Sequence, residues 1–191
     1  HDADAHALVA AAREAGATAV RVGPVADDRA ALREVLADQM VRADLLVVLG
    51  GLAAGPGDTV GDVLAELPDV RVDQVAMTPG GRMGFGVVPG SVLPMDDGAP
   101  GVIVAALPGH PVSALLGFEM FLRPALRAMA GQVTLYRPTV HAAATRPWAS
   151  PAGLTQVVPA TVVGSPGDGY AATPLEPETP SLAALARANA L

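Results

Sequence analysis

Apolar and polar positions repeat along the first two thirds of the chain in patterns that predict helices and strands in turn. Apolar residues at helical spacing, with acidic residues before them or glycine after them, predict helices at residues 5–15, 27–41, 59–66 and 111–129. Short apolar runs predict strands at residues 18–22, 45–49, 72–77 and 102–107. Because strands and helices alternate and the strands are largely apolar, we expect a parallel sheet covered on both faces, and so an α/β domain over residues 1–132.

The last of these helices carries its own start and stop signals. Pro111 stands at its first turn and Gly131 follows its end, as helix-end preferences predict. Pro124 lies inside the same helix. Because proline has no N–H to donate, we expect Pro124 to kink or interrupt the helix.

The pattern changes after residue 132. Short β-like pieces at residues 139–143, 156–163 and 170–173 are separated by turns rich in proline, glycine and serine. The tail at residues 181–191 carries leucine and alanine and predicts a short helix. Residues 133–191 are therefore expected to form a small β domain with a barrel-like fold.

The charge pattern narrows the classes of partner. The 191-residue chain has a formal net charge of −7 and only 12 basic residues, which argues against nucleic-acid binding, because such binding needs a basic surface that displaces counterions. All 12 basic residues are arginine, and the chain has no lysine. Arginine and lysine side chains are not equivalent in phosphate sites. The absence of cysteine excludes disulfides and cysteine-based zinc sites.

Hydropathy and the N-terminus indicate where the protein works. The chain is 51% hydrophobic, yet none of its apolar stretches approaches the roughly 20 residues that span a bilayer. The first residues lack the basic and apolar regions of a signal peptide, and they lack a starting methionine. We expect a cytoplasmic protein without a transmembrane helix, of which this chain is a part.

Three loops rich in glycine and proline carry the candidate chemistry, because loops at strand ends offer backbone N–H groups to bound anions. The first loop follows the strand at 45–49 and contains Gly50, Gly51, Gly55 and Asp58. Asp58 stands close to a helix start, where it could simply cap the helix. It could instead hold a metal ion that bridges bound phosphates.

The second loop contains Pro79 and Gly80, and Arg82 follows beside a further glycine. An arginine on such a loop can grip a phosphate through two parallel hydrogen bonds. Exposed arginine on a turn is also common, so a purely structural role for Arg82 remains an equal alternative.

The third loop links the strand at 102–107 to the last helix and contains Pro108, Gly109, His110, Pro111 and Ser113. His110 could hydrogen-bond an anion or carry a proton, although a lone loop histidine is more often a surface or packing residue. Ser113, in the first helical turn, could cap the helix or contact a phosphate oxygen.

Taken in order, the three loops resemble those of the molybdopterin molybdenumtransferase family, called MoeA in bacteria and the E domain of gephyrin in animals. The family's G-G-x-S-x-G-x-x-D loop matches Gly50, Gly51, Gly55 and Asp58. The order and spacing of the loops together are far more specific than any one of them.

The other family motifs also find counterparts. The family's K-P-G-K-P loop corresponds to residues 78–82, and its following F-G to residues 85–86. Its L-P-G-N-P-V-S segment corresponds to residues 107–113, followed by a phenylalanine-containing helix like residues 118–126. The family's R-D-S-N opening of the first helix is similar to residues 2–4. The resemblance covers nearly the whole chain.

The resemblance implies a fold and an activity. Residues 1–132 would be the MoeA-type, MogA-like three-layer molybdopterin-binding domain, and residues 133–191 the family's C-terminal β domain. The family inserts molybdenum from molybdate into adenylylated molybdopterin with the help of Mg²⁺, and it releases AMP. Asp58 would be the catalytic carboxylate and metal ligand, and the other loop residues named above would bind molybdopterin. Family members are homodimers. The resemblance implies that two N-terminal domains, and the first strand of the α/β domain with its T-G-D-E loop, lie outside this chain.

The sequence departs from the family motifs at several positions. Ala53 stands at the family serine, Thr78 and Gly81 at the two lysines, and His110 at the asparagine. A second hypothesis is therefore a catalytically degenerate, gephyrin-like scaffold that holds a segment of a partner protein at the cleft between the two domains. A third hypothesis is a MogA-like adenylyltransferase, which shares the α/β domain but normally lacks the β module.

Overall fold

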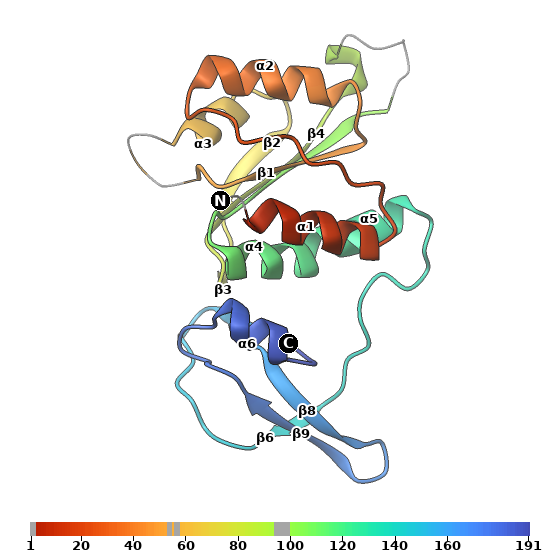
Figure 1. The fold of residues 1–191 in the computed structure, drawn as a ribbon, viewed down its shortest axis with the longest axis vertical. Coiled ribbons are helices and arrows are strands. Elements are labelled where there is room, and N and C mark those ends of the chain that lie inside the picture. Colours follow the sequence, from red (N-terminus) through yellow and green to blue (C-terminus); the bar gives the residue numbers. More distant parts are fainter. Residues whose placement is uncertain (1–2, 53–54, 56–57, 94–99) are drawn as a thin grey trace.

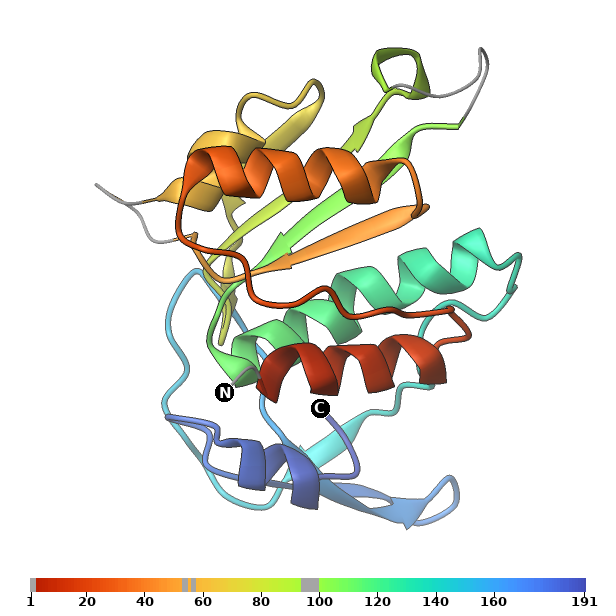
Figure 2. The same cartoon turned by 45° about the horizontal axis from the view of Figure 1, so that its top comes forward.

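The computed structural model describes residues 3–52, 55, 58–93 and 100–191. A four-stranded sheet forms the centre of the first part of the chain, with the strand order β1-β5-β4-β2. These strands are β1 (Leu45–Leu49), β2 (Val70–Gln74), β4 (Arg82–Val88) and β5 (Val102–Leu107). Helices lie on both faces of the sheet (Figures 1 and 2), so the expected α/β fold is confirmed.

One face of the sheet is covered by α2 (Arg29–Met40) and α3 (Thr59–Leu64). The side chain of Asp28 accepts a hydrogen bond from the N–H of Ala31 at 2.9 Å and so caps α2. Leu32, Leu36 and Met40 follow at helical spacing and are buried. They pack against apolar residues of α3 and the sheet and form one of the two cores.

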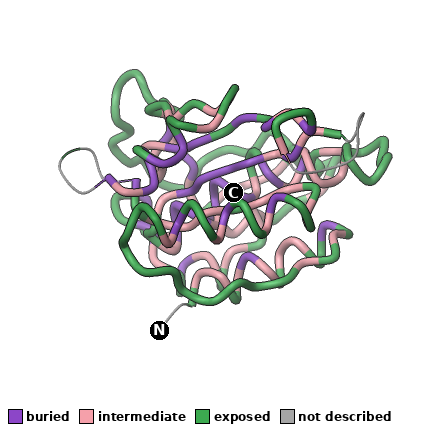
Figure 3. The backbone as a smooth tube through the Cα atoms, turned by 90° about the horizontal axis from the view of Figure 1, so that it is seen from above, coloured by how far each residue is buried: buried purple, intermediate pink, exposed green. Residues whose placement is uncertain are grey.

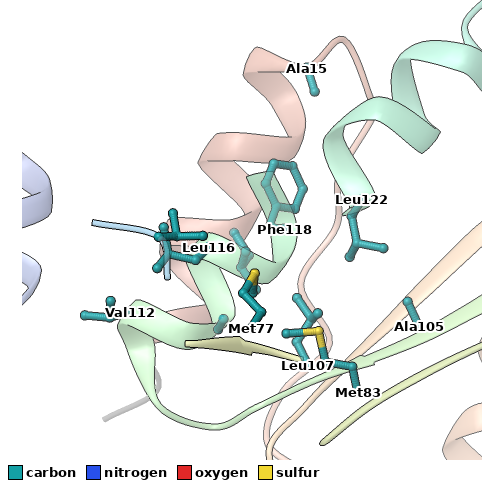
Figure 4. Packing of buried hydrophobic residues seen from close by; sticks show 12 residues of the cluster. Ala15, Met77, Met83, Ala105, Leu107, Val112, Leu116, Phe118 and Leu122 are labelled. Atoms are coloured by element: carbon teal, nitrogen blue, oxygen red, sulfur yellow. The ribbon is translucent and has the colours of Figure 1, made fainter. Parts of the chain in front are cut away.

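The other face is covered by α1 (Ala3–Glu14) and by a long helix in three parts. The parts are α4 (Pro111–Gly117), a π-helical turn η2 (Phe118–Leu122) and α5 (Arg123–Met129). The π turn ends two residues before Pro124, so the expected interruption of this helix is confirmed. Figure 4 shows the core beneath these helices, where Leu107 and Met83 lie below Leu116 and Phe118.

The sheet is mixed, whereas the sequence pattern predicted a parallel one. β1 and β5 are parallel, but β4 runs antiparallel to both β5 and β2. The strand β4 was not predicted, because Gly84 and Gly86 interrupt its apolar pattern and read as loop residues. Gly86 is nevertheless required there, since a Cβ at this position would collide with the backbone of Asp69 and of Val70, the first residue of β2.

The strand predicted at residues 18–22 is wrong. Residues 17–26 adopt neither helix nor strand, and Val20 is 82% exposed. A strand needs a neighbour that pairs with its backbone groups, and in the described part of the chain β1 pairs with β5 alone and leaves residues 18–22 outside the sheet. The apolar residues of this segment therefore remain at the surface, and Figure 3 draws it as exposed.

The C-terminal module contains a three-stranded sheet of order β6-β9-β8. Its strands are β6 (Ala142–Ala144), β8 (Ala160–Ser165) and β9 (Gly169–Pro174), and α6 (Leu182–Arg187) follows them. The described strands form an open sheet, so the barrel expectation is corrected. The strand expected at 156–163 is split into β7 (Thr155–Gln156) and β8, because Pro159 between them has no N–H for a ladder.

The remaining elements are short. β3 (Met77–Thr78) pairs in parallel with β7, and a single 3₁₀ turn, η1, covers Gly90–Val92. Throughout the described ranges, the helices fall short of the length and apolar character that crossing a membrane requires.

Candidate functional site

All three glycine loops lie at one end of the four-stranded sheet. Loop 1, residues 50–58, follows β1, and loop 3, residues 108–113, follows β5. Because β1 and β5 are parallel and pair Leu49 with Leu107, both loops leave the sheet at the same edge. Loop 2, residues 78–82, enters β4, which is antiparallel to β5, so it reaches that edge as well. The topology therefore brings the three loops together at one edge of the sheet.

Loops 1 and 3 touch through their glycines. The N–H of Gly50 donates to the carbonyl oxygen of Leu107 at 3.0 Å. A Cβ added at Gly109 would lie 3.0 Å from the Cα of Gly50. Gly50 and Gly51 have φ values of 80° and 66°, which side chains rarely adopt. This contact is therefore a matter of backbone shape and tolerates few side chains.

Asp58 is buried at the end of loop 1. Its Oδ1 accepts a hydrogen bond from the N–H of Gly61 at 2.9 Å, so Asp58 caps α3. Its Oδ2 accepts a hydrogen bond from Nη1 of Arg82 on loop 2. Gly61 was not singled out from the sequence, yet a Cβ there would collide with the Asp58 carboxylate. The capping role of Asp58 is thus confirmed, and the structure joins it to a second candidate residue.

Arg82 is a partly buried residue. Its side chain is 28% exposed and that of Asp58 is 10% exposed. A guanidinium carries five N–H donors in a fixed plane, and one of them, on Nη1, donates to Asp58. Arg82 can therefore hold Asp58 and still offer N–H groups to an anion at the mouth of the loops.

A metal ion at Asp58 would find one protein carboxylate. Within the described ranges, histidine, aspartate and glutamate side chains do not come together in groups of three that could hold a metal ion. The Asp58 carboxylate offers about four lone-pair positions, and two of them accept the hydrogen bonds described above. Mg²⁺ commonly takes one or two carboxylates together with water and phosphate oxygens. Asp58 fits such an ion as one ligand of several.

Loop 2 is shaped by its glycines. A Cβ at Gly80 would lie 2.5 Å from the carbonyl oxygen of Met77, and Gly81 has a φ of 131°. The carbonyl oxygen of Gly81 accepts a hydrogen bond from the N–H of Val75 at 3.1 Å, which closes the loop at its base. Pro79 and Gly80 are half-buried between the two ends of this turn.

Loop 3 presents a histidine to solvent. His110 is exposed and occupies the N-cap position of α4, with Pro111 at the first turn. Its imidazole makes no capping hydrogen bond, but its carbonyl oxygen accepts one from the N–H of Ala114 at 2.9 Å. Ser113 is 6% exposed and lies inside the helix, so it is not the capping residue.

The remaining candidate residues add to the loop backbones. Gly55 has a φ of 128°, and a Cβ there would meet open space. Pro108 is half-buried and Gly109 is exposed. Ala53, which stands at the family serine, lies outside the described residues. Together the described parts of the loops bring glycine backbone, the Arg82 guanidinium and the exposed His110 imidazole to one edge of the sheet.

An apolar groove lies elsewhere on the molecule. It has a volume of about 1310 Å³ and runs between the outer side of β2 and β4 and the helix formed by η2 and α5. Phe85, Met120 and Phe121 are among its lining residues. Residues Met83 to Val87 of β4, which come directly after loop 2, are part of its lining. None of the predicted site residues lines the groove.

Comparison with known proteins gives a consistent result. The model of the family described as "Probable molybdopterin binding domain" matches residues 1–128. Molybdopterin molybdenumtransferase 1 of Mycobacterium tuberculosis is 38% identical over 153 residues, which cover 80% of this chain and 34% of that protein. Molybdopterin molybdenumtransferase 2 of the same organism is 37% identical over 155 residues, or 78% of this chain and 36% of that protein. The chain thus spans about a third of the length of these relatives.

The fold has a solved counterpart. The crystal structure of a molybdopterin biosynthesis MoeA protein from Pyrococcus horikosii superimposes with a TM-score of 0.68 at 24% sequence identity. The match covers 98% of this chain and 42% of that one. It therefore includes both the α/β part and the C-terminal module.

Proposed function

The chain belongs to the MoeA family of molybdopterin-binding proteins, and we propose that its protein inserts molybdenum from molybdate into adenylylated molybdopterin. The observation that carries the proposal is the convergence of three glycine loops around the Asp58–Arg82 pair at one end of the sheet. Such an end offers backbone N–H groups and a fixed cation to the phosphate groups of a bound substrate.

The loop backbones would bind molybdopterin. Gly50, Gly51 and Gly55 of loop 1 and Pro79 and Gly80 of loop 2 shape two sides of the site. The third side comes from loop 3, whose contributing residues are Pro108, Gly109, Pro111 and Ser113. Because the two family lysines are absent here, the backbone amides would make a larger share of the contacts to the substrate phosphate than they do in family members that have those lysines.

Two side chains would contact the charged groups directly. Arg82 keeps its ion pair with Asp58 and directs its remaining N–H groups at a phosphate. His110, exposed at the start of α4, donates a hydrogen bond to an anion such as molybdate, or carries a proton during the reaction. Both interactions strengthen when bound substrate excludes water from the loop ends.

Asp58 would contribute one carboxylate oxygen to a Mg²⁺ ion. When bound, such an ion would supply positive charge next to the substrate phosphates. The hydrogen bond from Gly61 and the ion pair with Arg82 hold the carboxylate in place. The other ligands would come from water and substrate phosphates.

We further propose that the protein is a cytoplasmic homodimer, as the family resemblance implies. The gephyrin-like scaffold remains the second candidate, with a protein segment bound between the α/β part and the C-terminal module. The apolar groove between β4 and α5 gives it no support, because the groove's lining residues lie in the α/β part, apart from Leu135 and Tyr136 on the connection that precedes β6.

The test is calorimetric binding of molybdopterin to the complete protein and to two matched variants. Arg82→Gln should weaken binding about tenfold or more, as expected for the loss of a charge-assisted hydrogen bond. Arg71→Gln, at a side chain that is 79% exposed on β2, should leave binding unchanged. Undetectable binding of molybdopterin to the unmodified protein at high micromolar concentration would reject the proposal.

Activity in cells provides a second test. The complete gene should restore molybdenum-cofactor synthesis in a bacterial strain that lacks its own molybdenumtransferase. Failure of a well-expressed protein that nevertheless binds molybdopterin would favour the scaffold.

A further inference from the structure

A short segment of the C-terminal module is built into the stem of loop 2. β7 pairs in parallel with β3, so that Thr155 lies beside Met77 and Gln156 beside Thr78. The N–H of Thr155 donates to the carbonyl oxygen of Ala76 at 2.9 Å. Two residues later, the N–H of Val157 donates to the carbonyl oxygen of Thr78 at 2.8 Å. These backbone bonds end directly before Pro79 and Gly80.

Val157 also anchors this segment in the core of the α/β part. Its side chain is 7% exposed and belongs to the same core as Met77, Leu107, Val112 and Leu116. Figure 1 shows β3 extending from the sheet toward the C-terminal module, where α6 lies below α4. Loop 2 is therefore held from below by residues that come almost 80 positions later in the sequence.

The opposite end of loop 2 is fixed by the site itself. Arg82, the first residue of β4, pairs with the buried Asp58 of loop 1. Loop 2 thus lies between two attachments, β7 on its entering side and Asp58 on its leaving side. A displacement of β7 changes the position from which Arg82 reaches the site.

Gln156 connects β7 to the rest of its module. Its Oε1 accepts a hydrogen bond from Nε1 of Trp148 at 2.9 Å, and its Nε2 donates to the carbonyl oxygen of Pro177 at 2.7 Å. Trp148 is the single tryptophan of the chain and is 36% exposed. A shift of loop 2 should therefore change the surroundings of Trp148, and with them its fluorescence.

We infer that residues 155–157 are positioning residues for loop 2, so that the C-terminal module sets the geometry of a binding site to which it contributes no ligand. The positioning of the loop follows from the contacts alone, and its effect on substrate rests on the proposed function. Arg82 and the amides of loop 2 meet the substrate phosphates in the right geometry only while β7 is paired with β3.

The first experiment measures amide hydrogen exchange in the complete protein without ligand. Thr155→Pro removes the N–H that donates to Ala76, and Thr155→Ala is the matched control because it keeps that N–H at an exposed position. In the proline variant the amides of Val75 and Met77 should exchange about fivefold faster, as expected for the loss of one backbone hydrogen bond. The amides of β8 and β9 should exchange as before.

A second variant covers the case in which Thr155→Pro does not fold. Val157→Ala keeps both backbone bonds and removes only the side chain that anchors β7 in the core. It should also accelerate exchange at Val75 and Met77, whereas Val163→Ala, at a residue that is 62% exposed on β8, should not. Equal exchange at Val75 and Met77 in the unmodified protein and in folded Thr155→Pro or Val157→Ala would overturn the inference.

The third measurement links the loop to its ligand. Molybdopterin should change the fluorescence of Trp148 in the unmodified protein, and Thr155→Pro should weaken binding about fivefold or more while Thr155→Ala binds normally. If molybdopterin does not bind at all, the proposed function fails but the exchange result still decides the positioning role. If it binds equally to both variants, the positioning role in binding is rejected and the proposed function stands.

Discussion

An arginine pairs with a carboxylate both at the loop end of the sheet and on the helical surface, but the surroundings of the two ion pairs differ. Asp58 and Arg82 are 10% and 28% exposed, whereas Arg33 of α2 and Glu66 after α3 are 48% and 49% exposed. Water screens the surface pair and competes for its hydrogen bonds. At the loops each partner depends on the other, because an unpaired buried charge is costly. We therefore expect substitution of the partly buried Arg82 to lower stability more than substitution of the exposed Arg33.

The largest effect should come from the loop backbone itself. Gly51→Ala places a side chain at a φ of 66° and makes its Cβ overlap with the side chain of Val60. We expect the free energy of unfolding to fall by about 2–4 kcal/mol from backbone strain and overpacking together. Urea unfolding measures this change. Gly23→Ala, at an exposed glycine whose Cβ would meet open space, is the control and should change stability by less than about 0.5 kcal/mol. Equal stability of the two variants would contradict the steric argument.

The buried ion pair should give the next largest effect. Arg82→Gln leaves the Asp58 carboxylate buried without its partner, and should lower stability by about 1–3 kcal/mol. Asp58→Asn and the double variant complete a thermodynamic cycle, measured by urea unfolding. The same substitution at Arg33 should cost much less, because that pair is solvent-exposed. A coupling energy below about 0.5 kcal/mol for Asp58 and Arg82 would remove the difference between the two regions.

The partly exposed ion pairs of Arg137 should give an effect between that of the buried pair and that of the exposed Arg33–Glu66 pair. Arg137 bonds Glu119 of η2 at 2.6 Å and Glu14 of α1 at 3.0 Å, and its own side chain is 52% exposed. Arg137→Gln should lower the free energy of unfolding by about 0.5–1 kcal/mol, since two partners share one arginine. Thermal unfolding at low and at high salt tests this, because screening should shrink the difference at high salt. A loss that is independent of salt would point to packing instead of charge.

The smallest effect should appear in a titration. The side-chain hydrogen bond from Arg33 holds the pKa of Glu66 below its ordinary value of 4.5. Because the folded pKa is lowered, the pair's contribution is present above pH 4.5 and is lost as the pH falls through the lowered pKa. NMR titration of the Glu66 carboxyl should show this lowered midpoint, and Arg33→Gln should return it toward the ordinary value. An unchanged midpoint in the variant would show that the hydrogen bond does not operate in solution.

Local sequence signals predicted those elements whose causes are local. Asp28 caps α2 and the apolar run at Leu45–Leu49 forms β1, because capping and hydrophobic runs act within a few residues. β4 escaped prediction because Gly84 and Gly86 are explained only by the close approach of neighbouring strands. The segment at 18–22 has the apolar residues of a strand but pairs with no described strand. Strand formation depends on a partner that the segment's own sequence does not reveal.

The site divides in the same way. The glycines and prolines of the three loops could be predicted, since each turn needs them locally. The pairing of Asp58 with Arg82 could not, because these residues lie 24 positions apart and meet only through the antiparallel course of β4. The attachment of loop 2 to β7 depends on still more distant contacts.

The π turn between α4 and α5 sets the rotation of α5 relative to α4 about the helix axis, and so the direction in which the side chains of each part point. An α-helix rotates by about 100° for each residue, and a π turn accommodates one extra residue. Before the turn, Val112 and Leu116 point into the core; after it, Arg123 and Arg127 donate hydrogen bonds to the carbonyl oxygens of Leu135 and Thr134 on the connection to the C-terminal module. Removing one residue from 118–122 would convert the π turn into regular α-helix. Both arginines would then rotate about the helix axis, away from that connection. The number of residues between α4 and α5, and not the identity of any one of them, therefore sets the direction in which the two arginines point.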